Sequence, residues 1–191
     1  MKLILASGSP YRKQLLERLQ IPFTVLSPDI DESPLAGELP QALAKRLARS
    51  KAQAIAAGSS QSVVIGADQV ATLDGKTSIG KPGSLESARR QLAAASGRTM
   101  RFHTALAVIA PGHALIEHCV PVAVTFRTLT SAEIDHYLAL EQPFDCAGSA
   151  KCEGLGIALL DSIRTDDPTA LIGLPMMLLA DALRRVGMPP L

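Results

Sequence analysis

The stretch that decides the fold reads Leu3-Ile4-Leu5-Ala6-Ser7-Gly8-Ser9-Pro10-Tyr11-Arg12. Its apolar first half predicts a buried strand, and the spaced leucines between residues 15 and 19 predict a helix directly after it. Ser9 is expected to cap this helix and Pro10 to be its first residue, because the N–H that proline lacks has no helical partner at that position. The stretch therefore predicts a strand, a tight loop and a helix in that order.

The loop of this stretch is a candidate anion site. Ser7 and Ser9 supply hydroxyls, the helix start supplies free N–H groups, and Arg12 supplies a guanidinium. A capped helix without any ligand explains Ser9 and Pro10 equally well, since such caps are common. Both interpretations stay open at this stage.

The composition is that of a compact aliphatic globule. Of 191 residues, 47% are hydrophobic, 19% are charged and 3% are aromatic, and the net charge is +1. A charge so close to zero produces no global field for a nucleic acid polymer or a membrane surface, so any anion site must be local. The length fits a single domain over residues 1–191, with room for two lobes.

Cysteine usage and hydropathy predict a cytoplasmic protein. The three cysteines, Cys119, Cys146 and Cys152, form no CxxC pair, which favours reduced thiols over disulfides or a zinc site. No apolar stretch approaches the roughly 20 residues that cross a bilayer. No signal-peptide pattern precedes the first strand. We therefore expect no membrane partner.

Strand and helix patterns continue along the chain. Asp74-Gly75 is a strong hairpin signal, and two long strand patterns around a turn at 111–113 predict a second hairpin. The remaining patterns predict strands at about 23–26, 63–73, 98–109, 115–128 and 157–163, and helices at about 40–57, 85–95, 131–140 (capped by Ser131) and 175–186.

Two carboxylates are candidates for chemistry. Asp68 lies with Gln69 inside the apolar strand 63–73, where an unpaired acid carries a desolvation cost. Glu32 lies in a proline-bounded acidic loop. Carboxylate oxygens suit Mg²⁺ or Mn²⁺. An Asp68 satisfied by backbone N–H groups and an acidic loop that is merely solvated stay open as alternatives.

Three cations accompany these carboxylates beside loops or helix ends. They are Arg12, Lys51 and Lys81, the last held between Gly80 and Pro82. Cations that hold phosphate oxygens, a divalent ion and a carboxylate that activates water are the components of phosphoryl chemistry. Composition alone supports this weakly, because any globule contains scattered lysines and aspartates.

Four segments, taken in order, resemble the Maf family of nucleotide pyrophosphatases. They are Leu5-Ala6-Ser7-Gly8-Ser9-Pro10-Tyr11-Arg12, Gly66-Ala67-Asp68-Gln69-Val70, Gly80-Lys81-Pro82 and Cys146-Ala147-Gly148-Ser149-Ala150-Lys151-Cys152-Glu153-Gly154. Supporting matches are Asp31-Glu32, Lys51-Ala52, Ser96-Gly97 and Gly173-Leu174-Pro175. Each motif alone is modest, but the ordered set is specific.

The resemblance implies an α/β fold, similar to that of inosine-triphosphatase-like proteins, in which a long mixed sheet carries helices in two lobes flanking a nucleotide-binding cleft. It also implies hydrolysis of a nucleoside triphosphate to a monophosphate and pyrophosphate with Mg²⁺ or Mn²⁺. By position, the resemblance makes Asp68 the general base and places Glu32 and Asp68 at the metal. The residues that it implies for the phosphates are Ser7, Ser9, Arg12, Lys51 and Lys81.

Three positions resemble the subfamily that acts on 7-methyl-GTP: Tyr11, where most Maf sequences carry arginine, Gln69 and Glu153. Relatives acting on dTTP and UTP typically show Arg, Thr and Gln there. N7-methylguanine is cationic, and an aromatic face attracts a cation by about 0.5–2 kcal/mol. A carboxylate such as Glu153 can accept hydrogen bonds from N1–H and the amine of guanine. Tyr11 could instead extend the apolar stripe of Leu15 and Leu19.

Two further hypotheses remain beside 7-methyl-GTP pyrophosphatase activity. One keeps the enzyme and changes the substrate to dTTP, UTP or another modified nucleotide. The other is a nucleotide-binding regulator of septum formation without catalysis, against which the presence of Asp68 counts. The expected partner is a small nucleoside triphosphate, and a second copy of the chain in a homodimer is the protein partner considered.

Overall fold

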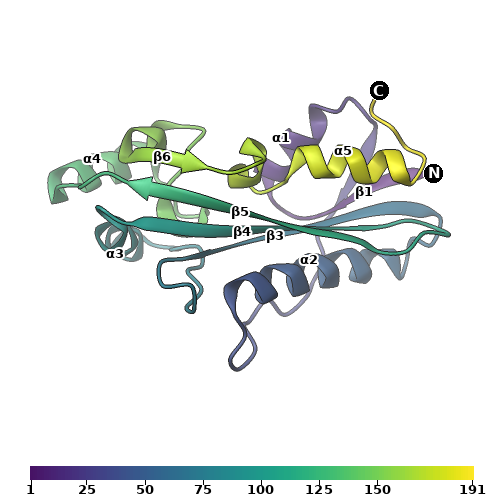
Figure 1. Cartoon of the computed structure of the whole chain (residues 1–191), viewed down its shortest axis with the longest axis horizontal. Helices are drawn as coiled ribbons and strands as arrows, with labels where there is room; N and C mark the ends of the chain where they lie inside the picture. Colours follow the sequence, from purple (N-terminus) through teal and green to yellow (C-terminus); the bar gives the residue numbers. More distant parts are fainter.

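The computed structural model describes residues 1–191 as a six-stranded sheet with helices on both faces (Figure 1). Its strands are β1 Lys2–Ala6, β2 Phe23–Leu26, β3 Ser62–Thr72, β4 Thr99–Ile109, β5 Ile116–Phe126 and β6 Leu160–Arg164. The spatial order is β2-β1-β3-β4-β5-β6. β1 pairs in parallel with β2 and β3, and the other neighbours are antiparallel. The expected mixed sheet is confirmed.

The helices are α1 Pro10–Glu17, α2 Pro40–Ala56, α3 Leu85–Ala95, α4 Ser131–Glu141 and α5 Met176–Arg185. Short 3₁₀ helices are η1 Ala147–Ser149, η2 Leu155–Leu159 and η3 Pro168–Ile172. None of the helices is long and apolar enough to span a membrane.

The long strands β3, β4 and β5, of 11 residues each, extend through two lobes (Figure 1). In the first lobe, α2 covers one face of the sheet and α1 and α5 cover the other, so that an apolar cluster forms on each side. In the second lobe, α3 and α4 pack with β4 and β5 around a third cluster. The expected two-lobed α/β architecture is therefore present.

Gly66 on β3 allows α2 to approach the sheet at backbone contact distance. A Cβ at Gly66 would lie 2.7 Å from the amide nitrogen of Ala52 and closer still to the carbonyl oxygen of Ala48. Both atoms belong to the helix backbone, so no side chain could rotate away. This close packing brings Lys51, the neighbour of Ala52, to the surface of β3.

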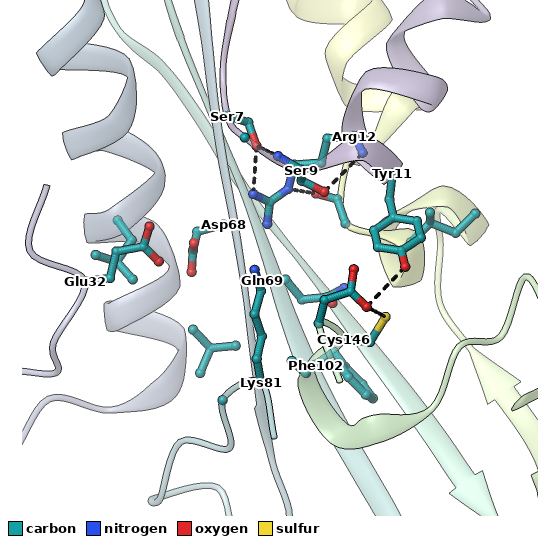
Figure 2. A pocket seen from close by; sticks show the side chains of 18 of the residues that line it. Ser7, Ser9, Tyr11, Arg12, Glu32, Asp68, Gln69, Lys81, Phe102 and Cys146 are labelled. Atoms are coloured by element: carbon teal, nitrogen blue, oxygen red, sulfur yellow. Dashed lines mark hydrogen bonds between the residues drawn. The ribbon is translucent and has the colours of Figure 1, made fainter. Parts of the chain in front are cut away.

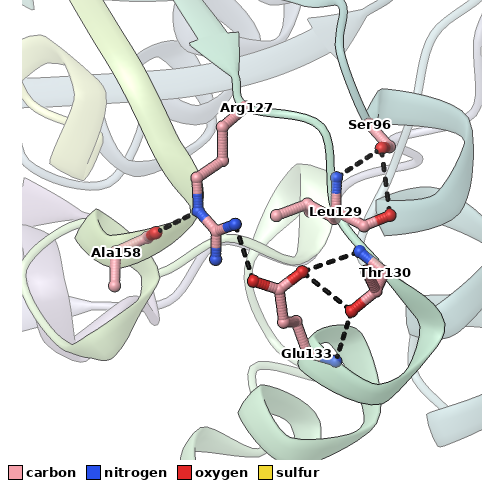
Figure 3. Close-up of polar contacts among 6 residues, drawn as sticks. All are labelled: Ser96, Arg127, Leu129, Thr130, Glu133 and Ala158. Carbon is pink, nitrogen blue, oxygen red and sulfur yellow. Dashed lines mark hydrogen bonds and ion pairs between the residues drawn. The ribbon is translucent and has the colours of Figure 1, made fainter.

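The prediction that Ser131 caps the helix at 131–140 is wrong by one residue. Thr130 is the N-cap of α4: its hydroxyl accepts from the backbone N–H of Glu133, and the Glu133 carboxylate accepts from the backbone N–H of Thr130 (Figure 3). The other oxygen of Glu133 accepts from Arg127 at 2.7 Å. This reciprocal capping box satisfies two groups at once, whereas Ser131 would satisfy one.

The expected strand at 157–163 is wrong over its first part. Residues 155–159 form η2, because Gly154 and Gly156 both donate to the carbonyl of Lys151 and turn the chain locally. Pairing with β5 begins only at Leu160, opposite Phe126. The turn at Asp74-Gly75 is present, but its return strand is reduced to one bridge between Ala71 and Ile79.

Candidate active site

A cavity opens at a gap along one edge of β3. β1 ends at Ala6, opposite Gly66, and the next pairing on this edge is the bridge at Ala71. Asp68 and Gln69 therefore lie on an edge without a partner strand. A cavity of about 580 Å³ opens there, between the β1–α1 loop, α2, residues 78–81, residues 145–153 and η3.

Every residue that the sequence predicts for the site lines this cavity. The set comprises Ser7, Ser9, Tyr11, Arg12, Glu32, Lys51, Asp68, Gln69, Lys81 and Glu153. They come from segments far apart in the chain, and both lobes contribute. Figure 2 shows Asp68 and Glu32 on one side of the cavity and Tyr11 and Cys146 on the other, with Gln69 and Lys81 between them.

Asp68 faces α2 because side chains alternate along β3. The ammonium of Lys51 lies 2.6 Å from Oδ1 of Asp68 and 2.9 Å from Oε1 of Glu32. Burial raises the pKa of Asp68, while the charges of Lys51 and Arg12 lower it in part. Asp68 is thus a buried carboxylate whose ionised form depends on two cations.

The β1–α1 loop forms the capped helix start that the sequence predicts. The Ser9 hydroxyl accepts from the backbone N–H of Arg12 at 3.4 Å. The guanidinium of Arg12 donates from Nη1 to Ser7 Oγ at 3.3 Å and from Nε to the Gly173 carbonyl at 2.9 Å (Figure 2). Burial lowers the pKa of Arg12, and the charges of Asp68 and Glu32 offset this in part. The arginine is held in place from two sides.

Gln69 points to the opposite face of the sheet and binds protein backbone. Its amide nitrogen lies 2.9 Å from the carbonyl oxygens of Ala170 and Leu171 and 3.0 Å from the Thr104 hydroxyl. Its two N–H groups are therefore engaged by η3 and β4, and only its oxygen is available to a ligand. The immediate effect of Gln69 is to fix η3, whose next residue, Gly173, binds Arg12.

Tyr11 lies in the cavity and belongs to none of the three apolar clusters. The alternative that it extends the stripe of α1 is therefore wrong. Its hydroxyl donates to Oδ1 of Asp145 at 3.3 Å, and the ammonium of Lys151 lies 5.7 Å from the ring centroid. Burial, together with the neighbouring Cys146 and Asp145, raises the pKa of Tyr11, so the hydroxyl keeps its proton.

Lys81 and Glu153 are two exposed charges of the cavity that form no ion pair within the chain. Figure 2 shows the side chain of Lys81 extending into the cavity. A cation and an anion without ion-pair partners are available to charges on a ligand.

Sequence reasoning missed Asp145, Thr104 and the carbonyl of Gly173. Asp145 directly precedes the segment 146–154, so its position beside a recognised motif was the available signal. Thr104 gave no signal, because its role follows from its register opposite Gln69 on β3. The Gly173 carbonyl is a backbone atom brought to Arg12 by the packing of η3 against α1.

The two carboxylates next to Lys51 suit a hard divalent cation. The chain contains no group of three or more His, Cys, Asp or Glu residues that could form a protein-only metal site. Mg²⁺ usually takes one or two carboxylates and completes its coordination with water and substrate phosphates. Glu32 and Asp68, which share one ammonium, offer that number of carboxylates.

Residues 2–186 match the family model described as Maf-like protein. The chain belongs to the Maf family. A Maf relative from Bordetella pertussis, named 7-methyl-GTP pyrophosphatase, is 57% identical over 190 residues, 100% of this chain and 94% of that protein. A relative of the same name from Cupriavidus metallidurans is 56% identical over 189 residues, 98% of this chain and 94% of that protein.

Among solved structures, the Ham1 protein of Staphylococcus aureus matches with a TM-score of 0.49 and 16% identity, over 66% of this chain and 72% of that one. A likeness at this level adds nothing to the assignment of this Maf chain. The family assignment therefore depends on the sequence matches, and the description of the site depends on the geometry above.

Proposed function

We propose that this Maf protein hydrolyses 7-methyl-GTP to 7-methyl-GMP and pyrophosphate. The names of the two relatives above support this substrate. The main observation behind the proposal is that two kinds of side chain lie on opposite sides of one cavity. Buried Asp68 with its cations lies on one side, and the aromatic ring of Tyr11 lies on the other.

The triphosphate is proposed to bind beside the β1–α1 loop. Arg12, Lys51 and Lys81 supply positive charge there, and the hydroxyls of Ser7 and Ser9 can donate to phosphate oxygens. Because Arg12 is anchored by Ser7 and Gly173, little side-chain entropy is lost when it binds an anion.

Asp68 is proposed to be the general base. It would take a proton from a water molecule as the water oxygen bonds to the α-phosphorus. The bond from the α-phosphorus to the αβ-bridging oxygen then breaks, and pyrophosphate leaves with the electron pair. The raised pKa of Asp68 suits proton acceptance, while Lys51 and Arg12 stabilise the carboxylate form that the step requires.

Glu32 and Asp68 are proposed to hold Mg²⁺ or Mn²⁺ together with the substrate. When bound, such an ion neutralises developing charge on phosphate oxygens. On the other side of the cavity, Tyr11 is proposed to stack on the cationic base and Glu153 to accept from the guanine edge. Gln69 is proposed to support the phosphate-binding side through η3 and Gly173.

Release of pyrophosphate from a panel of nucleotides tests the proposal. The panel contains 7-methyl-GTP, GTP, dTTP and UTP, each with Mg²⁺ or Mn²⁺. We expect the highest kcat/KM for 7-methyl-GTP. A higher value for dTTP or UTP would favour the pyrimidine alternative, and triphosphate binding without pyrophosphate release would favour a regulator without catalysis.

A further inference from the structure

We propose that Asp145 is a specificity-determining residue that favours a nucleotide whose base carries a positive charge. This inference rests on the proposed function, and it concerns a residue outside the motifs that define the family resemblance. Asp145 lines the cavity and is exposed to it.

The contacts of Asp145 leave half of its carboxylate available. Oδ1 accepts from the Tyr11 hydroxyl at 3.3 Å and from the Cys146 thiol at 3.5 Å. Oδ2 has no hydrogen-bond partner within the chain. The carboxylate therefore fixes the ring of Tyr11 through one oxygen and presents the other beside that ring.

The charges around Tyr11 are arranged to attract a cation. Asp145 and Glu153 line the cavity without ion-pair partners. The nearby ammonium of Lys151 is compensated, because it lies 3.0 Å from a carboxylate oxygen of Glu141. Burial raises the pKa of the Cys146 thiol to about 12, so this group is neutral and leaves the two carboxylates as the local charges.

The side of the cavity that holds Asp68 carries more positive than negative charge. Arg12 and Lys51 line it beside the carboxylates of Asp68 and Glu32. Lys81, which has no ion-pair partner, lies between the two sides, so three cations face two carboxylates here. A ligand that is negative at one end and positive at the other matches this layout. A 7-methylated purine triphosphate has such a distribution, whereas GTP has the same shape apart from one methyl group and a neutral base.

The backbone holds Asp145 in this position. The carbonyl of Phe144, its neighbour, accepts from the backbone N–H of Gly83 at 3.0 Å, which joins this turn to the loop that carries Lys81. Three residues later, Gly148 adopts φ +74°, and a Cβ there would lie 2.6 Å from Sδ of Met100. The backbone on both sides of Asp145 is therefore anchored, which keeps this residue next to Tyr11.

The test compares Asp145→Asn with the wild-type protein on 7-methyl-GTP and GTP. Asparagine keeps an oxygen acceptor for the Tyr11 hydroxyl and removes the charge. We expect the ratio of kcat/KM for 7-methyl-GTP to that for GTP to fall about two- to fivefold, the size expected for one partly exposed charge pair. The fall should come mainly from a higher KM for 7-methyl-GTP, and any change in the constants for GTP should be smaller.

Asp161→Asn is the matched control. Asp161 is an exposed aspartate on β6 that does not line the cavity, so its loss should leave the ratio unchanged. An unchanged ratio in Asp145→Asn, or an equal loss for both nucleotides, would overturn the inference.

Binding of 7-methyl-GMP and GMP, measured by calorimetry, separates this inference from the proposed function. If the wild-type protein fails to hydrolyse 7-methyl-GTP, the proposed function fails. A preference for 7-methyl-GMP that Asp145→Asn reduces would still support the role of Asp145. Equal binding of both monophosphates by wild-type protein would overturn that role.

Discussion

Lys51 and Asp68 form a buried ion pair, with 2.6 Å between Nζ and Oδ1 and with side chains only 7% and 8% exposed. The pair joins α2 to β3 next to Gly66, where the two elements are in closest contact. Burial favours the protonated form of Asp68, and Lys51 is the first of the cations that oppose this. The protonation state of the proposed base therefore depends on helix packing as well as on its neighbours.

Asp68→Asn tests the proposed base. Asparagine keeps the size and one oxygen for Lys51 but cannot take a proton from water. We expect pyrophosphate release to fall by about 10²–10⁴, the usual contribution of general-base catalysis. Thermal unfolding should show that the variant remains folded. Turnover close to that of the wild type would exclude Asp68 as the base.

Lys51→Met tests whether Lys51 lowers the pKa of Asp68, and the pH profile of activity is the measurement. The charge of Lys51 lowers the pKa of Asp68, so its removal raises that pKa further. The base must be deprotonated to act, and the acidic limb of kcat/KM should therefore move to higher pH. Lys51→Arg keeps the charge and should leave the limb near its wild-type position. A limb that stays in place or moves to lower pH in Lys51→Met would contradict the coupling.

Gly66→Ala tests the close approach of α2 and β3. The new Cβ would meet the backbone of Ala48 and Ala52, so the helix must shift away. We expect a loss of about 1–3 kcal/mol of unfolding free energy, as for other overpacked sites. The melting temperature should fall by roughly 2–4 °C for each kcal/mol. Gly58→Ala is the control, because no atom lies within 4 Å of a Cβ at that position.

Local sequence patterns were sufficient for much of the fold. The apolar run before Ser7 and the Ser9–Pro10 pair predict β1 and α1, and the capping bond to Arg12 confirms the helix start. Where two adjacent residues could each cap a helix, as at Thr130 and Ser131, the outcome depended on the reciprocal bond from Glu133. The pattern at 157–159 failed because backbone turn bonds, which leave no periodicity, begin at Lys151.

The site was predictable only where it coincides with motifs. Asp68 and Gln69 stood out as polar residues in an apolar strand, and alternation along a strand puts them on opposite faces. The sequence could not show that Asp68 would face Lys51 and Gln69 would face η3. Thr104 and Asp145 act through partners 35 and 134 positions away, Gln69 and Tyr11. Contacts at such separations depend on strand register and on the packing of both lobes, which periodicity does not encode.

Thr104→Val tests whether η3 supports the phosphate-binding side. The Thr104 hydroxyl donates to the carbonyl of Ala170 at 2.8 Å and accepts from Gln69. Its loss should loosen η3 and, through Gly173, the anchor of Arg12. We expect KM to rise about fivefold, the equivalent of a hydrogen bond worth roughly 1 kcal/mol.

Two control variants separate this effect from a loss of stability. Thr104→Ser keeps the hydroxyl and should restore KM. Thr125→Val removes a hydroxyl that pairs with Thr99, and neither residue lines the cavity, so KM should not change. A lower melting temperature with an unchanged KM in Thr104→Val would limit Thr104 to a structural role.

The combined substitution Tyr11→Arg, Gln69→Thr and Glu153→Gln tests the origin of base selection. Arginine at position 11 removes the aromatic face and repels a cationic base, and glutamine at 153 removes a negative charge. Preference in pyrophosphate release should move from 7-methyl-GTP towards dTTP and UTP. Gln69→Thr alone serves as the comparison: because Gln69 holds η3, this change should raise KM for all nucleotides without reversing the order. If the triple variant still prefers 7-methyl-GTP, other residues of the cavity, Asp145 first among them, must carry the selection.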